Sequence, residues 1–267
     1  MAGIDPKVLP GSEVLVATGW EARNYIGGII GKKPIHVETP EERNSLVKFS
    51  DIRIDIGARN RKEVENDFDV HIGSPIVLGR SINLEFGKNR LYGNALDDKS
   101  GIFIISEVIS KLLHDPRDSW KEKYSIIVMA CTGEESGLLG SHRMAHIINP
   151  DISIDLDVTP SSDLGQLKDE VIRLGRGPVI EFGQDKSRRI NNCLRNICEA
   201  KKIPYQCHVS KIGGTNTKSF FLESRDSETT LISLPLLSMH TAIESMHWKD
   251  IEWTIDLLEE VIVSQNL

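Results

Sequence analysis

The sequence lacks any apolar run long enough to cross a bilayer. Its first seven residues contain no apolar core of the kind that signal peptides carry. Positive charge is also scarce, with 32 Lys and Arg against 39 Asp and Glu, a net charge of −7 and no basic stripe. We therefore expect a cytoplasmic protein whose partners include neither a membrane nor a nucleic acid.

Cysteine is scarce as well. The chain has four cysteines, none of them in a CxxC pair, and the nearest two are Cys193 and Cys198. This spacing argues against a zinc–thiolate site and favours reduced thiols. With 267 residues, 39% of them hydrophobic and 27% charged, the chain can bury a sizeable core in one large or two smaller domains.

The first part of the chain, residues 1–89, has the pattern of a small all-β domain. Short β-like runs alternate with Gly and Pro, and Ile52–Ile56 alternates strictly between apolar and polar residues. A short helix is expected over Arg61–Phe68, after Asn60 as its cap. The expected strands are Glu13–Thr18, Tyr25–Gly31, Ile52–Ile56 and Pro75–Leu78. Several short strands with turns between them predict a barrel-like or sandwich domain.

Residues 90–267 have an α/β pattern instead. Apolar residues recur at helical spacing after residue 102, and a continuous apolar run at Tyr124–Cys131 predicts a buried strand. Further strands are expected at Ile152–Val158, Tyr205–Val209 and Thr229–Leu234, and further helices at Gly137–Ile148, Ser187–Lys201 and from about Asp250. This alternation predicts a mostly parallel central sheet flanked by helices.

Two pairs of carboxylates stand where an apolar run gives way to a helical pattern. Asp97 and Asp98 form the first pair, and Glu134 and Glu135 form the second. Each pair has an ordinary structural explanation, since Asp favours helix N-caps and acidic residues favour first helical turns. Two neighbouring carboxylates can also divide the work of a hydrolase, with one binding a metal and the other carrying a proton.

Two further candidate ligands follow predicted strands. Asp157 ends the strand Ile152–Val158, and His240 follows the apolar run Leu231–Leu237. Ligands of α/β sheets gather at the carboxyl ends of strands, so the joint placement of these side chains predicts one divalent-metal site. His142 and His146 are four residues apart on another predicted helix, but without a third ligand we interpret them as a solvated helix face.

Several motifs resemble the glutamyl-aminopeptidase family of dinuclear metallo-exopeptidases, which includes the tetrahedral aminopeptidases. The resemblance covers essentially the whole chain. It rests on Gly93-Asn94-Ala95-Leu96-Asp97-Asp98, Glu134-Glu135-Ser136-Gly137-Leu138, Asp157-Val158-Thr159, Arg176-Gly177-Pro178, Gly213-Gly214-Thr215 and Met239-His240, and on Gly31-Lys32-Lys33-Pro34-Ile35-His36 and Ile54-Asp55-Ile56-Gly57-Ala58 in the β-rich part.

The resemblance implies a role for each candidate residue. Asp97 would bridge two divalent metals, zinc or cobalt, and the peptide bond after it would be cis. Glu135 and His240 would complete one metal site, Asp157 would belong to the other, and Glu134 would be the general base. The substrates would be short peptides, which would lose their N-terminal residues. The β-rich domain would serve homo-oligomer assembly and access to the site.

The chain also departs from the family pattern. Members usually carry a metal-ligating His in an N-terminal part of the catalytic domain, whereas no His precedes His36 here. The second metal site would lack its imidazole, and the catalytic domain would be incomplete. Asn216 stands where an Asp is usual, and Thr241-Ala242 replaces the usual Ser-Pro after His240.

These departures leave three functions open. The first is a metallo-aminopeptidase with two metals. The second is a non-catalytic relative that binds one metal or none and serves as an assembly or peptide-binding subunit. The third is an amidohydrolase or deacylase of a related dinuclear fold, against which the β insertion and the Asp157-Val158-Thr159 motif argue.

Overall fold

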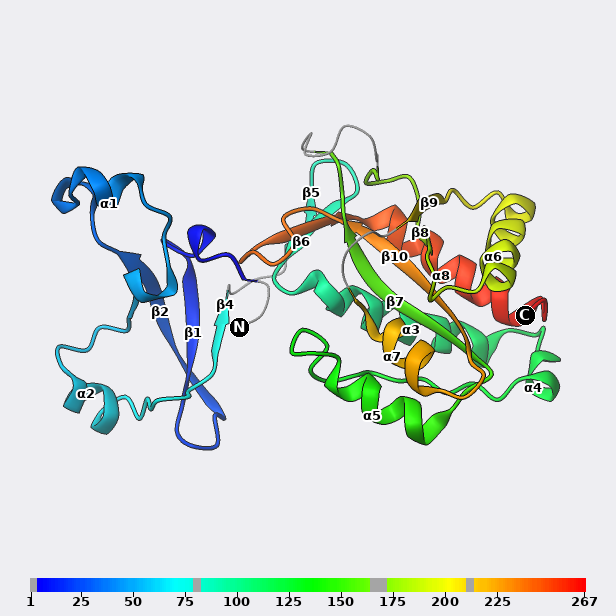
Figure 1. Cartoon of the computed structure of the whole chain (residues 1–267), viewed down its shortest axis with the longest axis horizontal. Coiled ribbons are helices and arrows are strands. Elements are labelled where there is room, and N and C mark those ends of the chain that lie inside the picture. Colours follow the sequence, from blue (N-terminus) through cyan, green and yellow to red (C-terminus); the bar gives the residue numbers. More distant parts are fainter. Residues whose placement is uncertain (1–3, 79–82, 164–171, 210–213) are drawn as a thin grey trace.

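The computed structural model describes residues 4–78, 83–163, 172–209 and 214–267. Gly213 of the Gly213-Gly214-Thr215 motif lies outside these ranges. Figure 1 shows one group of strands with α1 and α2, formed by the N-terminal part of the chain, at one end of the molecule, and a larger α/β body that contains the other helices. Each part has its own hydrophobic core.

The N-terminal part is a four-stranded antiparallel sheet with the order β3-β2-β1-β4. All four predicted strands are confirmed, and the predicted helix after the Asn60 cap is α2. The elements are β1 (Glu13–Thr18), β2 (Asn24–Lys32), α1 (Pro40–Asn44), β3 (Ile52–Asp55), α2 (Arg61–Asn66) and β4 (Ile76–Leu78). No pairing among the described strands closes this sheet, so it is an open sheet around a small core and not the barrel-like domain that the pattern predicted.

The central sheet has the order β7-β10-β8-β9. Its strands are β7 (Ile152–Pro160), β8 (Val179–Phe182), β9 (Gln206–Val209) and β10 (Glu228–Leu236). β10 runs parallel to β7 and antiparallel to β8, and β8 runs parallel to β9. The sheet is therefore mixed, which corrects the prediction of a mostly parallel one. The predicted strands at the positions of β7, β9 and β10 are confirmed.

A third, smaller sheet joins distant parts of the chain. β6 (Arg90–Gly93) pairs antiparallel with β5 (Asn83–Phe86) on one side and with β11 (Glu244–His247) on the other. No strand was predicted at these three positions, because the runs are short and each depends on its neighbours for pairing.

Helices flank the central sheet, as predicted. They are α3 (Leu96–His114), α4 (Trp120–Lys123), α5 (Leu139–Ile148), α6 (Arg188–Lys201), α7 (Asn216–Glu223) and α8 (Trp248–Val263). α8 packs against α3, α6 and β10, whereas α7 packs against α5, β7 and β10 (Figure 1). The apolar stripe of each longer helix supplies the main core.

The strand predicted at Tyr124–Cys131 is wrong. Its residues form no ladder with any described strand, and the side chains of Ile126, Ile127 and Val128 are 39%, 60% and 48% exposed. A continuous apolar run indicates a buried strand only if neighbours supply backbone hydrogen bonds on its edges. That pairing is absent among the described residues.

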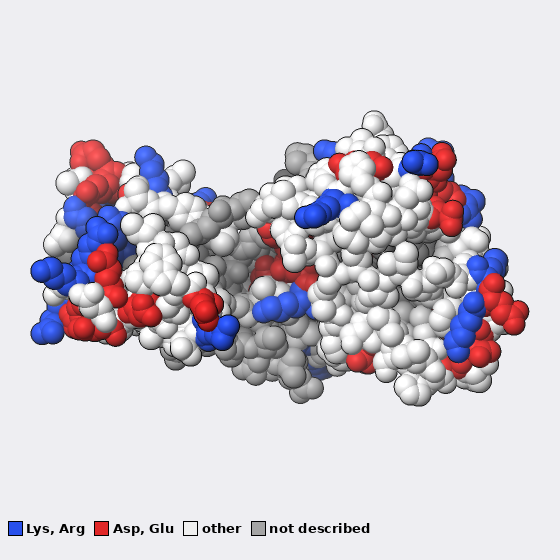
Figure 2. Space-filling model, turned by 90° about the horizontal axis from the view of Figure 1, so that it is seen from below, with Lys and Arg blue, Asp and Glu red and all other residues white. Residues whose placement is uncertain are grey.

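The surface carries both signs of charge. On the face shown in Figure 2, Lys and Arg are interspersed with Asp and Glu at both ends of the molecule. Within the described ranges, no helix has the length and apolar character that a membrane span requires.

Candidate metal centre

The pairing of β6 with β11 brings Asp97 and His240 together. In this register Glu244 lies opposite Gly93. Asp97 follows Gly93 by four residues, and His240 precedes Glu244 by four, so the two side chains reach the same end of the ribbon from different strands. Ala95 and His240 both have positive φ, 52° and 60°, a conformation that non-glycine residues adopt mainly where the surrounding structure holds them.

The loop before α5 carries Glu134 and Glu135. Gly140, at the start of α5, donates its N–H to the carbonyl oxygen of Thr132 at 2.9 Å. A Cβ at Gly140 would lie 2.7 Å from that oxygen, so only glycine permits this close approach. The contact closes the loop and holds both glutamates beside the ends of β6 and β10.

Three of the predicted ligands meet. The side chains of Asp97, Glu135 and His240 each offer one atom within 4.8 Å of the other two. His240 Nε2 lies 3.2 Å from Asp97 Oδ2 and 3.3 Å from Glu135 Oε1. The Asp97 carboxylate is nearly buried, while Glu135 is about half exposed, so the cluster is open to solvent on one side. The peptide bond between Asp97 and Asp98 is cis, as the resemblance implied.

Glu244 supports two of these residues from behind. It is buried, and its carboxylate accepts the backbone N–H of His240 at 2.9 Å and that of Asp97 at 3.1 Å. One side chain therefore fixes the backbone of both candidate ligands. Sequence reasoning missed Glu244, since no local pattern marks it and its role depends on the pairing of β6 with β11.

The electrostatics of the site are those of a crowded set of carboxylates. Burial, followed by the charges of Glu135 and Glu244, raises the pKa of Asp97 to about 6. Burial and the charges of Glu135 and Asp97 raise the pKa of Glu134 to about 7. Negative charges brought together out of water repel one another, and a cation is the usual compensation.

Asp157 is not in the three-residue group. It lies on β7, and burial, followed by the charge of Asp155, raises its pKa to about 9. The charges of Asp97 and Asp98 contribute to this shift, so Asp157 belongs to the same electrostatic neighbourhood. Its place as a metal ligand stays a prediction.

The two remaining carboxylates have structural partners. Asp98 Oδ1 accepts the N–H of Gly101 at 2.8 Å, so within this pair Asp98 makes the helix-capping contact. The half-buried Asp155 accepts both the N–H and the hydroxyl of Thr217, at 2.9 and 3.1 Å, and so connects β7 to the first turn of α7.

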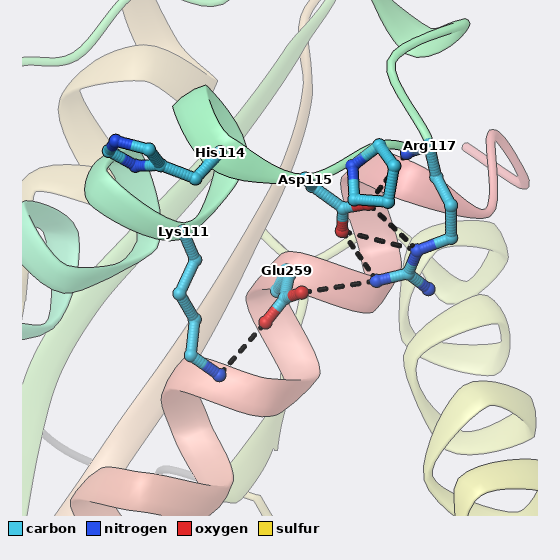
Figure 3. A pocket seen from close by; sticks show the side chains of 6 residues that line it. Lys111, His114, Asp115, Arg117 and Glu259 are labelled. Carbon is cyan, nitrogen blue, oxygen red and sulfur yellow. Dashed lines mark hydrogen bonds and ion pairs between the residues drawn. The ribbon is translucent and has the colours of Figure 1, made fainter.

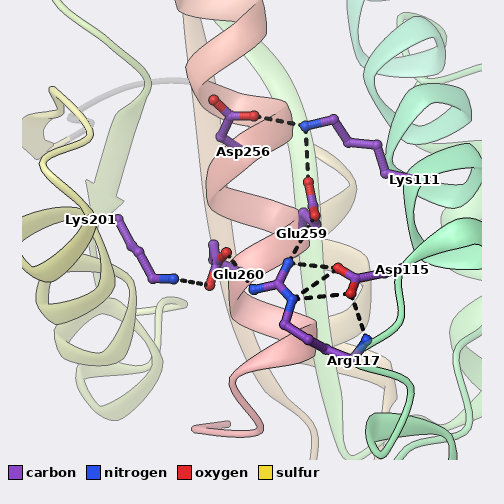
Figure 4. A network of polar contacts seen from close by, with 7 residues as sticks. All are labelled: Lys111, Asp115, Arg117, Lys201, Asp256, Glu259 and Glu260. Atoms are coloured by element: carbon purple, nitrogen blue, oxygen red, sulfur yellow. Dashed lines mark hydrogen bonds and ion pairs between the residues drawn. The ribbon is translucent and has the colours of Figure 1, made fainter.

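A separate pocket of about 410 Å³ lies at the other end of α3 (Figure 3). Its charged groups are paired with one another, as Lys111 and Arg117 both contact Glu259. The contacts extend to Asp115, Asp256, Glu260 and Lys201 (Figure 4). Because α3 runs between Asp97 and this pocket, the two are on the order of 25 Å apart. We interpret the network as a structural clamp among α3, α6 and α8.

The donor set of the Asp97 cluster suits a divalent metal. One imidazole and two carboxylates are typical zinc ligands, and cobalt accepts the same donors. Burial and the repulsion between neighbouring carboxylates raise the pKa of Asp97, and a bound cation would favour its charged form. Asp97, Glu135 and His240 therefore fit a divalent metal. Glu244 would hold the backbone of two of these ligands in place.

Comparisons with known proteins point to the same chemistry. The chain is 24% identical over 237 residues to a lysyl aminopeptidase of Pyrococcus furiosus, covering 88% of this chain and 66% of that protein. An aminopeptidase structure from the archaeon Desulfurococcus kamchatkensis superposes with a TM-score of 0.84 at 28% identity, covering 98% of this chain and 71% of the other.

A third relative is the TET1 peptidase of Pyrococcus horikoshii, which can assemble into a tetrahedron or a large octahedral shell. It superposes with a TM-score of 0.73 at 25% identity, covering 97% of this chain and 73% of that one. The chain thus spans roughly two thirds to three quarters of the length of these relatives. The M42 glutamyl aminopeptidase family profile matches residues 1–257, and the chain belongs to this family.

Proposed function

We propose that this protein is a metal-dependent aminopeptidase that removes N-terminal residues from short peptides. The observation that carries the proposal is the meeting of Asp97, Glu135 and His240, with Glu134 in the same loop as Glu135. The names and structures of its relatives support the same reaction class.

The proposed ligand roles are those that the resemblance implies, and the meeting of Asp97, Glu135 and His240 supports them. Glu135 and His240 would hold one metal, Asp97 would bridge to a second, and Asp157 would hold the second. A divalent metal supplies Lewis acidity, which acidifies water and polarises the peptide carbonyl. Zinc or cobalt fits the donors, and Glu244 would keep Asp97 and His240 in position by holding their backbone.

Glu134 would act as the general base. Its carboxylate lies in the same loop as Glu135, and burial raises its pKa, so it can accept a proton from the attacking water and return it to the leaving amine. Its neighbour Glu135 contacts His240, so the two glutamates divide metal binding and proton transfer between them.

The β-rich N-terminal part, residues 1–89, would serve assembly. Its core is separate from the main one, and its surface displays Trp20, 82% exposed and stacked on His71, and Ile72, 91% exposed. We propose a homo-oligomer formed through this part, and light scattering that finds a monomer at micromolar concentration would contradict it. A cytoplasmic location is supported by the four free cysteines.

The test compares wild type with Glu134→Gln on a panel of aminoacyl chromogenic substrates, after loading with zinc or cobalt. The wild type should release amino acids, and Glu134→Gln should lose about 10²- to 10⁴-fold in kcat while it retains its metal. Glu107→Gln, an exposed change on α3, is the matched control.

Metal-loaded wild type without turnover would favour the second candidate, a non-catalytic peptide-binding or assembly subunit. Asp157 lies outside the three-residue group, which gives that candidate its support.

A further inference from the structure

The interface between α5 and α7 holds a second set of metal-ligating side chains. His142 and His146 are four residues apart on α5 and therefore share one helix face. Glu223, the last residue of α7, lies opposite them. The sequence pattern shows the two histidines but no third ligand near them. In the fold, Glu223 supplies a third candidate ligand from about 80 residues further along the chain.

Contacts in the packed interface fix the distance between the two helices. Ser141 and Ser219 are both fully buried, and their hydroxyls are 2.8 Å apart. Ser141 lies next to His142 in the sequence, and Ser219 lies one helical turn before Glu223. The position of the carboxylate relative to the two imidazoles is therefore set by a buried contact and does not depend on exposed side chains alone.

The two imidazoles approach different oxygens of one carboxylate. His142 Nδ1 contacts Glu223 Oε1, and His146 Nε2 lies 3.2 Å from Oε2. Glu223 Oε2 is shielded from solvent yet accepts no hydrogen bond. Its ion-pair partner is His146 Nε2, whose approach does not have hydrogen-bond geometry, and a cation between the two atoms would satisfy both.

One of the two contacts has the spacing of metal ligands, whereas the ligand atoms of all three side chains do not yet lie within 4.8 Å of one another. Zinc bonds to nitrogen and oxygen ligands at about 2.0–2.2 Å, so neighbouring tetrahedral ligands are roughly 3.3–3.5 Å apart. The 3.2 Å between His146 Nε2 and Glu223 Oε2 is close to this value. The ring of His142 must turn from Oε1 toward the same point, and its 40% exposed side chain leaves room for that rotation.

We propose that His142, His146 and Glu223 form a divalent-metal site, of the zinc type, that clips α5 to α7. This site shares no residue with the Asp97 cluster. Two neutral imidazoles and one carboxylate form a common zinc donor set, and solvent can complete the coordination beside the 67% exposed His146. Because α5 follows directly after the loop of Glu134 and Glu135, the metal would also steady the helix that carries this loop.

The experiment isolates the clip in an Asp97→Ala/His240→Ala variant, which lacks the first site. Competition with a chromogenic zinc chelator should show one zinc per chain, and adding His142→Gln or His146→Gln should weaken binding about tenfold or more. Glu223→Gln should weaken it likewise, whereas His114→Gln, an exposed change at the end of α3, should have no effect. Circular dichroism confirms that each variant is folded.

A second measurement covers the case in which the isolating variant fails to fold. In the wild-type background, His142→Gln/His146→Gln should bind one zinc fewer per chain and lose part of the zinc-induced rise in Tm. Equal zinc content and equal Tm shifts in the two proteins would overturn the proposal. So would an isolating variant that folds but binds no zinc, and the three side chains would then be an ion-paired contact only.

Discussion

Replacing Glu244 by Ala should loosen the metal centre without removing any metal ligand. The buried carboxylate accepts the N–H groups of Asp97 and His240, and the substitution removes this acceptor from both. An unsatisfied buried N–H is unfavourable by about 1–3 kcal/mol, so the two together amount to roughly 2–6 kcal/mol. Part of this is lost folding stability, and the rest appears as backbone movement that displaces the two ligands.

The effect on metal affinity should be about 10- to 100-fold, the usual result of removing a group that orients metal ligands. The assay is competition for zinc against a chromogenic chelator, performed in the His142→Gln/His146→Gln background so that only the first site is measured. Thr241→Ala is the matched control, because the hydroxyl of this half-buried neighbour of His240 donates to the carbonyl oxygen of Ile243 and not to the cluster. Unchanged zinc affinity in folded Glu244→Ala would refute the reasoning.

Three further predictions concern stability. Gly177→Ala should lower the free energy of unfolding in urea by about 3 kcal/mol or more, because φ is +92° and a Cβ would overlap the carbonyl oxygen of Pro204. Gly31→Ala is the control, because a Cβ there meets open space, and it should change the free energy of unfolding by less than about 1 kcal/mol. Arg117→Ala should lower the free energy of unfolding by about 1–2 kcal/mol, because it removes three ion pairs. High salt should reduce the difference from wild type, and a difference independent of salt would contradict the ion-pair explanation. Burial, then two nearby cations, lowers the pKa of His247, so this imidazole takes up its proton more readily in the unfolded chain. His247→Asn keeps a helix cap, and the stability of the wild type relative to this variant should fall as the pH drops below about 6.5. A stability difference between the two proteins that does not change with pH would count against the assignment.

Local patterns in the sequence predicted most of the helices and strands. α6 illustrates why, since its apolar stripe and the capping side chain of Ser187 lie within one short segment. The same information placed β1, β2, β7 and β10 within a few residues. Such elements depend on neighbours a few residues away, and those neighbours are visible in the sequence.

The errors share a different physical cause. The apolar run at 124–131 resembles a buried strand, but strand formation depends on pairing partners from elsewhere in the chain. The direction of β8 against β10 likewise depends on long-range packing and made the sheet mixed. Patterns along the chain contain little information about either.

The sequence predicted the three residues that meet in the candidate site, but it did not predict Glu244, which holds two of them in place. Asp97, Glu135 and His240 stood at the ends of apolar runs, where function is common, and the structure brings them together. Glu244 and Glu223 have no local signal, because Glu244 lies 147 positions from Asp97 and Glu223 lies 81 positions from His142.

The measurement that tests the central claim most directly is zinc-edge anomalous diffraction from crystals of the wild-type protein grown with zinc. The account predicts a strong anomalous peak within bonding distance of Asp97, Glu135 and His240. A well-ordered structure that shows no anomalous density among these three side chains would contradict it.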